Sequence, residues 1–133
     1  MSKQFIFEIK VYYEDTDSGG VVYYANYLKF LERARTEMIQ SFGMSNKKLL
    51  KNFKTSIIVK SCNLEYNKTA KLEDKLKIYS SILSIKKASF FMVQDIKRDN
   101  ELILSSKTQL VTVNTNGKPI KIPNDLEKQL NKF

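Results

Sequence analysis

The sequence contains no histidine and only one cysteine, Cys62. The absence of histidine excludes the Ser-His and Cys-His pairs that activate many enzyme nucleophiles, and a zinc site would need the rare combination of carboxylates and one thiol. Acid–base chemistry near neutral pH must therefore fall to Asp, Glu, Tyr, Lys or Cys62. A single cysteine cannot form an internal disulfide, which is typical of a reducing compartment.

Long apolar runs are also missing, because no stretch approaches the ~20 apolar residues that cross a bilayer. The first ten residues, MSKQFIFEIK, place charges on both sides of three apolar residues and lack the cleavage pattern of a signal peptide. We therefore expect a cytoplasmic protein. A length of 133 residues, with 42% hydrophobic and 28% charged residues, predicts one globular domain spanning residues 1–133.

Arginine is scarce, with three arginines among 23 basic residues, although the net charge is +9. A positive balance of this size favours an anionic partner: nucleic acid, a membrane surface or a phosphate-bearing small molecule. The abundance of lysine and asparagine also fits the codon usage of an AT-rich genome, which would leave the charge without a function. The composition leaves both interpretations open.

The first part of the chain changes from a period of two to a helical period. Residues 5–13 alternate apolar and polar side chains, which predicts a half-buried strand, and Ser18, Gly19 and Gly20 end it with a turn. A helix of about four turns is then expected, with Asn26 as its N-cap and Gly43 at its end. Its apolar face consists of Tyr27, Phe30, Leu31, Ala34, Met38 and Phe42.

The second part of the chain is rich in residues that favour strands. After a polar connection at residues 45–54, strands are expected at about 55–66, 75–85, 88–97 and 102–113. Tight turns at Lys86-Lys87 and Asp99-Asn100 indicate sequential antiparallel pairing. Asn124 and Glu127 resemble the capping box of a short last helix. The pattern predicts an α+β fold in which a helix packs against a curved antiparallel sheet.

Asp15 and Asp17 are the first candidates for chemistry. Two residues apart on an extended strand, they would project to the same side. They could hold a divalent metal or simply hydrate a surface loop. However, Gly19-Gly20 and the start of the helix bring backbone N–H groups close to the same turn. A carboxylate that faces such a helix end is what acyl transfer through an oxyanion requires.

Three tyrosines and a basic turn are further candidates. Tyr23, Tyr24 and Tyr27 either pack in the core with their hydroxyls in water or line a slot for an acyl or aromatic group. Lys86 and Lys87 either form a solvated hairpin tip or meet the phosphates of a nucleotide-bearing ligand. No dinucleotide-binding motif, Walker loop or C-x-x-C occurs.

The stretch YEDTDSGGVVYYANYL at residues 13–28, continued by FLERARTE at 30–37, resembles the hotdog-fold acyl-CoA thioesterases of the 4-hydroxybenzoyl-CoA thioesterase family. It is most similar to their bacterial Tol-Pal-associated branch, and the likeness recurs weakly at residues 117–119 and Pro123. It covers essentially the whole chain. The resemblance implies a hotdog fold, in which a five-stranded antiparallel sheet wraps one long central helix, and homodimers or homotetramers with active sites at subunit interfaces.

The resemblance also implies an acyl-CoA thioester hydrolase in which Asp17 is the nucleophile or the general base and backbone N–H groups near Tyr24 form the oxyanion hole. It implies neither metal nor cofactor, a substrate carried on coenzyme A or acyl carrier protein, no nucleic acid, and peripheral association with the inner membrane. Many Tol-Pal-associated members carry His where this chain has Tyr24, a difference that bears on acyl preference. The residues expected at the substrate are Gly20, Val22, Tyr23, Tyr24, Tyr27, Lys86, Lys87 and Ser89.

Two functions from different classes follow. The first is hydrolysis of acyl-CoA thioesters, with Asp17 driving the attack and basic side chains holding the CoA phosphates. The alternative is a non-catalytic acyl- or anion-binding hotdog module, whose positive charge serves nucleic acid or a membrane. The few arginines, and the absence of the aromatic-basic pattern of single-strand binders, count against the alternative.

Overall fold

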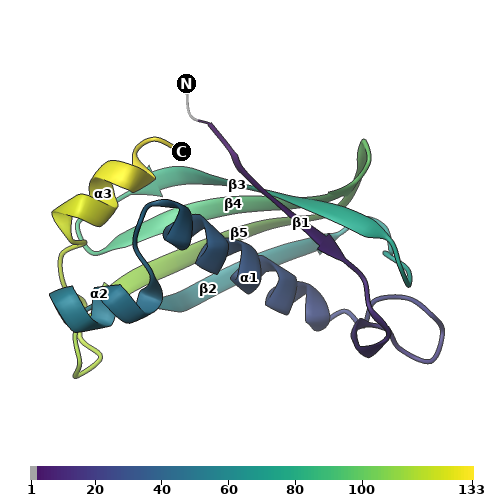
Figure 1. Cartoon of the computed structure of the whole chain (residues 1–133), viewed down its shortest axis with the longest axis horizontal. Coiled ribbons are helices and arrows are strands. Elements are labelled where there is room, and N and C mark those ends of the chain that lie inside the picture. Colours follow the sequence, from purple (N-terminus) through teal and green to yellow (C-terminus); the bar gives the residue numbers. More distant parts are fainter. Residues whose placement is uncertain (1–2) are drawn as a thin grey trace.

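The computed structural model describes residues 3–133, which form one five-stranded sheet and three α-helices (Figure 1). This confirms the α+β class and the antiparallel sheet. The expected long helix is α1 and the expected short last helix is α3, whereas α2 is a further helix. The strands are β1 (Phe5–Lys10), β2 (Ser56–Tyr66), β3 (Lys75–Ile85), β4 (Ser89–Arg98) and β5 (Glu101–Val113). The helices are α1 (Asn26–Ser41), α2 (Asn46–Phe53) and α3 (Asn124–Leu130), with a 3-10 turn η1 at Tyr13–Asp15.

The sheet has the strand order β1-β3-β4-β5-β2, and all neighbours are antiparallel. The two predicted hairpins are confirmed, since β3 pairs with β4 and β4 with β5. The strand after α1, β2, instead pairs with β5, the last in the chain, and so forms one edge of the sheet. β1 forms the other edge, with Lys10 opposite Lys75 at the start of β3.

The long helix α1 lies across one face of the sheet, with β1 running beside it (Figure 1). Its predicted apolar face is confirmed except for Phe42, which follows the last residue of α1 and is half-buried, because the other predicted side chains at three- and four-residue steps are buried. Burying a large apolar side chain of this kind contributes about 1.5–3 kcal/mol to folding. The buried side chains of α1 are Tyr27, Phe30, Leu31, Ala34, Met38 and Ile39.

Both expected N-terminal caps are wrong, whereas the expected C-terminal glycine of the long helix is confirmed. The N-cap of α1 is Ala25, and the Asn26 side chain instead donates a 2.9 Å hydrogen bond to the carbonyl oxygen of Asp15. Gly43 does end the helix, with a φ of +78° that glycine tolerates. The cap of α3 is Pro123, and no capping box forms there.

The connection at residues 45–54 is not a loop, because it contains α2. The hydroxyl of Ser45 caps this helix by accepting a hydrogen bond from the Lys48 N–H at 3.0 Å. Lys54, in the left-handed region with φ +52°, ends it. None of the helices in residues 3–133 is both long and apolar enough to cross a membrane.

Candidate active site

Asp17 begins a tight hairpin loop that ends at Val22. Thr16 and Val22 form an isolated antiparallel bridge, and the Asp17 N–H donates to the Val21 carbonyl at 2.9 Å. Gly20 turns the chain with a φ of +82°, which favours glycine. The exposed Asp17 carboxylate accepts a 2.8 Å hydrogen bond on Oδ1 from the Gly19 N–H. Its Oδ2 has no hydrogen-bond or ion-pair partner among residues 3–133.

Asp15 is buried and hydrogen-bonded within the fold, and the expectation that it projects to the same side as Asp17 is wrong. The sequence predicted a strand over residues 5–13, but β1 ends at Lys10 and residues 13–15 form η1. The Asp15 carboxylate is 6% exposed and accepts a 2.9 Å hydrogen bond from the Tyr12 N–H. Nowhere in residues 3–133 do three or more Asp, Glu, Cys or His side chains group so that they could hold a metal ion.

The start of α1 lies beside the Asp17 loop, because the Tyr23 N–H donates a 2.9 Å hydrogen bond to the Asp15 carbonyl. Ala25 offers no side-chain cap, and the first turn carries no acidic residue. The backbone N–H groups of Tyr24 and Ala25 have no acceptor within the described residues. Such a helix end carries free donors and the positive end of the helix dipole, and it can therefore stabilise an anion.

The three predicted tyrosines divide into one core residue and two surface residues. Tyr27 is 3% exposed and packs in the core, whereas Tyr23 and Tyr24 are 46% and 63% exposed, with ring centroids 4.8 Å apart. Tyr66, at the end of β2, joins this cluster with its ring 6.5 Å from Tyr24 and 5.7 Å from Tyr27. No local sequence signal indicated Tyr66, because its neighbours Tyr24 and Tyr27 are about 40 positions away.

Burial raises the pKa of both Tyr27 and Tyr66, and a side-chain hydrogen bond with Tyr24 raises the pKa of Tyr23. At neutral pH these three hydroxyls therefore stay protonated and can act as donors but not as bases. The free oxygen of Asp17 can serve as a nucleophile or a base.

The loop at residues 67–74, which the sequence analysis did not single out, holds the Asp17 loop in place through hydrogen bonds. The Val22 N–H donates to the Ala70 carbonyl at 2.8 Å, and the Ala70 N–H donates to the Tyr27 hydroxyl at 3.0 Å. The Leu72 N–H also donates to the Gly20 carbonyl at 3.3 Å. Gly20 and Val22, expected at the substrate, thus also hold the loop in place through their backbone groups.

The structure does not bring Lys86, Lys87 and Ser89 to Asp17 within one chain. The two lysines are exposed in the β3–β4 hairpin, closed by a 2.7 Å hydrogen bond from the Lys86 N–H to the Ser89 carbonyl. The Asp17 loop lies near the opposite end of β3, where the Leu72 N–H contacts Gly20. Eleven strand residues at about 3.3 Å each separate the two ends by roughly 35 Å.

A cavity of about 140 Å³ lies between the middle of α1 and the sheet. Arg35 is half-buried at this cavity, where burial lowers its pKa, and its Nη1 donates to Gln94 Oε1 at 3.0 Å. The Thr36 hydroxyl donates to Glu32 Oε2 beside it. The remaining wall is mainly apolar and includes Met38, Ile39, Ile57, Phe90, Met92 and Leu110.

Comparison with known proteins relates this architecture to thioesterases. The chain is 38% identical over 125 residues to the acyl-CoA thioesterase YbgC of Haemophilus influenzae, covering 92% of this chain and 91% of the relative. It is 37% identical over 128 residues to the acyl-CoA thioester hydrolase YbgC of Escherichia coli, covering 95% and 92%. Each relative is thus matched over nearly its whole length.

Solved structures agree with the sequence relatives. A probable thioesterase from Bartonella henselae superposes with a TM-score of 0.87 at 31% identity, covering 90% of this chain and 99% of that one. A 1,4-dihydroxy-2-naphthoyl-CoA thioesterase from Synechocystis has a TM-score of 0.90 at 20% identity, covering 98% and 97%, and supports the fold alone. Residues 11–130 match the Thioesterase-like superfamily. The chain is therefore a hotdog-type thioesterase and belongs to the Thioesterase-like superfamily.

Proposed function

We propose that this thioesterase hydrolyses acyl-CoA thioesters to a carboxylic acid and free CoA, with Asp17 as the catalytic carboxylate. The observation that carries the proposal is the free Oδ2 of Asp17 in the loop that leads directly into a helix start with unpaired N–H groups at Tyr24 and Ala25. The identity of 37–38% with YbgC acyl-CoA thioesterases supports the substrate class. Placement in the Tol-Pal-associated branch is part of the proposal and rests on the resemblance at residues 13–37.

In the proposed reaction the thioester carbonyl oxygen points at the start of α1. The carbonyl carbon is attacked either by the Asp17 carboxylate or by a water molecule from which Asp17 takes a proton. Negative charge then develops on the carbonyl oxygen, and the backbone N–H groups near Tyr24 stabilise it. The C–S bond breaks and CoA leaves as a thiolate. In the first route a mixed anhydride on Asp17 remains, which water hydrolyses.

We also propose that the working enzyme is a homodimer or homotetramer with active sites between subunits. The basic hairpin that carries Lys86, Lys87 and Ser89 is too far from Asp17 of the same chain to hold the phosphates of the CoA bound there. A second subunit would supply these groups. The edge strand β2 favours self-association, because Ile58 and Val59 are 46% and 48% exposed on it.

The enzyme is proposed to work in the cytoplasm, as the composition predicts, and without a metal or cofactor, as the family resemblance implies. The carrier of the acyl group can be coenzyme A or acyl carrier protein, because the proposed chemistry involves only the thioester. The exposed rings of Tyr23 and Tyr24 form one wall for the acyl group. Acyl length or ring preference then depends on the groups that face this wall across the subunit interface.

The test is thiol release from short, long and aromatic acyl-CoA substrates, and from one acyl carrier protein thioester, by wild type and Asp17→Asn. Asparagine can still accept the Gly19 hydrogen bond, so the loop should keep its shape while the charge is lost. We expect kcat to fall by about 10²–10⁴. Asp125→Asn, an exposed acidic position on α3, is the matched control. Full turnover by Asp17→Asn would remove Asp17 from the mechanism.

A further inference from the structure

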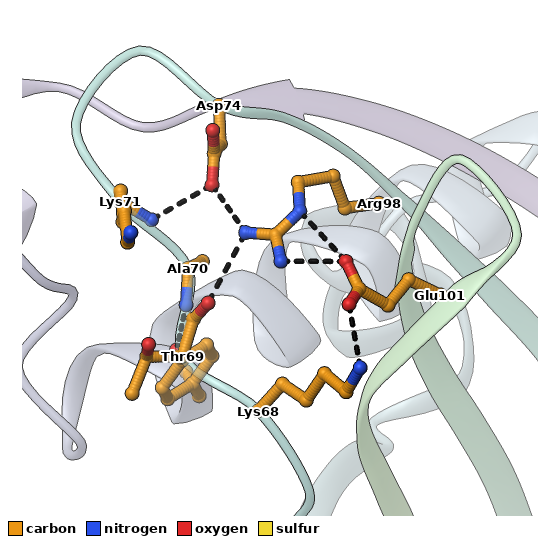
Figure 2. A network of polar contacts seen from close by, with 8 residues as sticks. Lys68, Thr69, Ala70, Lys71, Asp74, Arg98 and Glu101 are labelled. Carbon is orange, nitrogen blue, oxygen red and sulfur yellow. Dashed lines mark hydrogen bonds and ion pairs between the residues drawn. The ribbon is translucent and has the colours of Figure 1, made fainter.

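Arg98, the last residue of β4, is the centre of a polar network between the β4–β5 hairpin and the loop 67–74 (Figure 2). Its Nη1 donates to Asp74 Oδ2 at 2.7 Å and to the Thr69 carbonyl at 3.1 Å. Its Nη2 donates to Glu101 Oε1 at 2.6 Å, and Lys68 Nζ donates to Glu101 Oε2 at 2.7 Å. One guanidinium therefore ties two distant points of the loop to the hairpin.

The loop 67–74 has little apolar anchoring of its own. Ala70 is its one buried residue, and most of the others are exposed. At the entry to the loop, the N–H groups of Asn67 and Lys68 donate to the Ile103 carbonyl at 2.9 and 3.1 Å. At the far end of the loop, the Glu73 N–H donates to the Val11 carbonyl and the Val11 N–H donates to the Asp74 carbonyl, both at 2.9 Å. The contacts of Arg98 with the Thr69 carbonyl and the Asp74 side chain add to these backbone hydrogen bonds. Removal of the guanidinium should therefore loosen the loop while the core stays packed.

The loop in turn holds the backbone on which Asp17 sits. Ala70 is next to Thr69 in the chain and accepts the hydrogen bond from the Val22 N–H, while the Leu72 N–H donates to Gly20. Val21 and Lys71 also form an isolated bridge. The chain of contacts from Arg98 to the Asp17 loop is thus continuous and runs through backbone groups.

We propose that Arg98 is a positioning residue for Asp17, which fixes the catalytic loop through the loop 67–74 without touching substrate. This inference rests on the proposed function, since it assigns Arg98 a role in the same reaction. Displacement of a catalytic group by ~1 Å can cost about 10²-fold in rate. A loosened loop should therefore lower kcat while KM changes little.

The test compares Arg98→Met, which keeps the aliphatic stem, with Arg98→Lys, which keeps the charge but loses the forked donor set. Lys77→Met is the control, because it removes a surface lysine whose ion pair with Glu8 (3.6 Å) does not involve the loop 67–74. Hydrogen exchange at the Val22 and Leu72 amides is measured together with kcat and KM. We expect Arg98→Met to speed exchange at both amides and to lower kcat about tenfold, Arg98→Lys to fall between, and Lys77→Met to do neither.

The double variant Asp17→Asn/Arg98→Met separates positioning from general destabilisation. If Arg98 acts through Asp17, its replacement should cause no further loss once Asp17 is gone. Additive losses would overturn the proposal, and so would unchanged exchange in Arg98→Met. If the wild type hydrolysed no acyl-CoA, the proposed function would fail and the catalytic role of Arg98 with it. The exchange data would then still show whether Arg98 holds the loop.

Discussion

The backbone N–H of Gly19 donates a 2.8 Å hydrogen bond to Oδ1 of Asp17, and a Cβ at position 19 would lie 3.3 Å from that same oxygen. The contact is tighter than most Cβ contacts, so a side chain at position 19 would push the carboxylate by a few tenths of an ångström. Position 19 therefore controls the orientation of Asp17 without being a chemical group in the reaction. This separates it from Gly20, where the added Cβ would meet nothing within 4 Å.

Gly19→Ala should consequently affect activity more than stability. We expect kcat to fall by roughly tenfold, by the sensitivity of rates to small displacements, with the free energy of unfolding changed by less than about 0.5 kcal/mol. Gly20→Ala should instead lose about 1–2 kcal/mol of stability, because its φ of +82° strains any side chain. Gly117→Ala, with a φ of +78° in a distant turn, is the matched control for that strain. Urea unfolding and steady-state kinetics on the three variants test this, and unchanged kcat in Gly19→Ala would contradict it.

The sequence predicted elements whose signals are local. The helical period of Tyr27, Phe30 and Leu31 and the short turn at Lys86-Lys87 each depend on residues a few positions apart, and both are confirmed. The pairing of β2 with β5 and the support of Val22 by Ala70 join segments about 50 residues apart, for which one sequence carries no periodic signal.

Local signals also failed where a side chain had a better partner elsewhere. Asn26 has the chemistry of a cap, but its amide donates to the Asp15 carbonyl. The two aspartates of the D-T-D motif were expected on one face because the sequence predicted a strand that continued past its actual end. The 3-10 turn at residues 13–15 buries Asp15 and leaves Asp17 exposed. The resemblance to a family singled out Asp17, which spacing alone did not.

The hydroxyl of Tyr27 is the acceptor for the buried N–H of Ala70, at 3.0 Å. Tyr27→Phe would leave that donor without an acceptor, at a cost of about 1–3 kcal/mol in the free energy of unfolding. Tyr13→Phe, at an 81% exposed tyrosine, should change stability by less than about 0.5 kcal/mol. Chemical denaturation of both variants measures the difference. Equal stabilities would mean that another group takes over the Ala70 N–H.

Tyr24 tests the link between the helix start and acyl preference. Its side chain is 63% exposed, while the proposed oxyanion donor at this position is the backbone N–H, which any residue other than proline retains. Tyr24→His should therefore still hydrolyse thioesters, with kcat for the best substrate within about tenfold of wild type, and should alter the ratio of kcat/KM between aromatic and straight-chain acyl-CoA. Loss of hydrolysis on every substrate would show that the hydroxyphenyl ring itself is required.

The Glu101 carboxylate makes the free energy of unfolding depend on pH in the acid range. Hydrogen bonds from Lys68 and then Arg98 lower the pKa of its carboxyl from 4.5 to about 2. Because the pKa is lower in the folded state, the stabilisation is complete above pH 4.5 and is lost as the pH falls towards 2. Glu101→Gln should therefore reduce the difference in unfolding free energy between pH 6 and pH 2, and Lys68→Met should do so in part. Urea unfolding across this range measures the effect, and identical pH profiles for wild type and Glu101→Gln would contradict it.

The helix α2 is the surface on which the expected membrane association can be tested. Residues 46–54 carry lysines at positions 47, 48, 51 and 54 and no acidic residue. None of these lysines is in an ion pair within residues 3–133. Leu49 anchors the helix in the core, while Leu50 and Phe53 are 46% and 40% exposed. Lysines beside exposed apolar side chains are the composition that binds anionic lipid surfaces.

Wild type should therefore sediment with anionic vesicles at low salt and not with zwitterionic vesicles, because each lysine near the surface contributes about 1 kcal/mol that salt screens. Leu50→Ser/Phe53→Ser should reduce this binding, whereas Leu83→Ser, at a 56% exposed leucine on β3, should not. If the protein binds no vesicles at low salt, the expectation of membrane association is wrong. Duplex DNA serves as a second anion in the same assay, and steep salt-dependent binding to it would favour the anion-binding alternative over a purely catalytic protein. If the protein binds neither vesicles nor DNA, the positive charge is left to bind the phosphates of the CoA thioester, because CoA is then the one anionic partner that the proposed function requires.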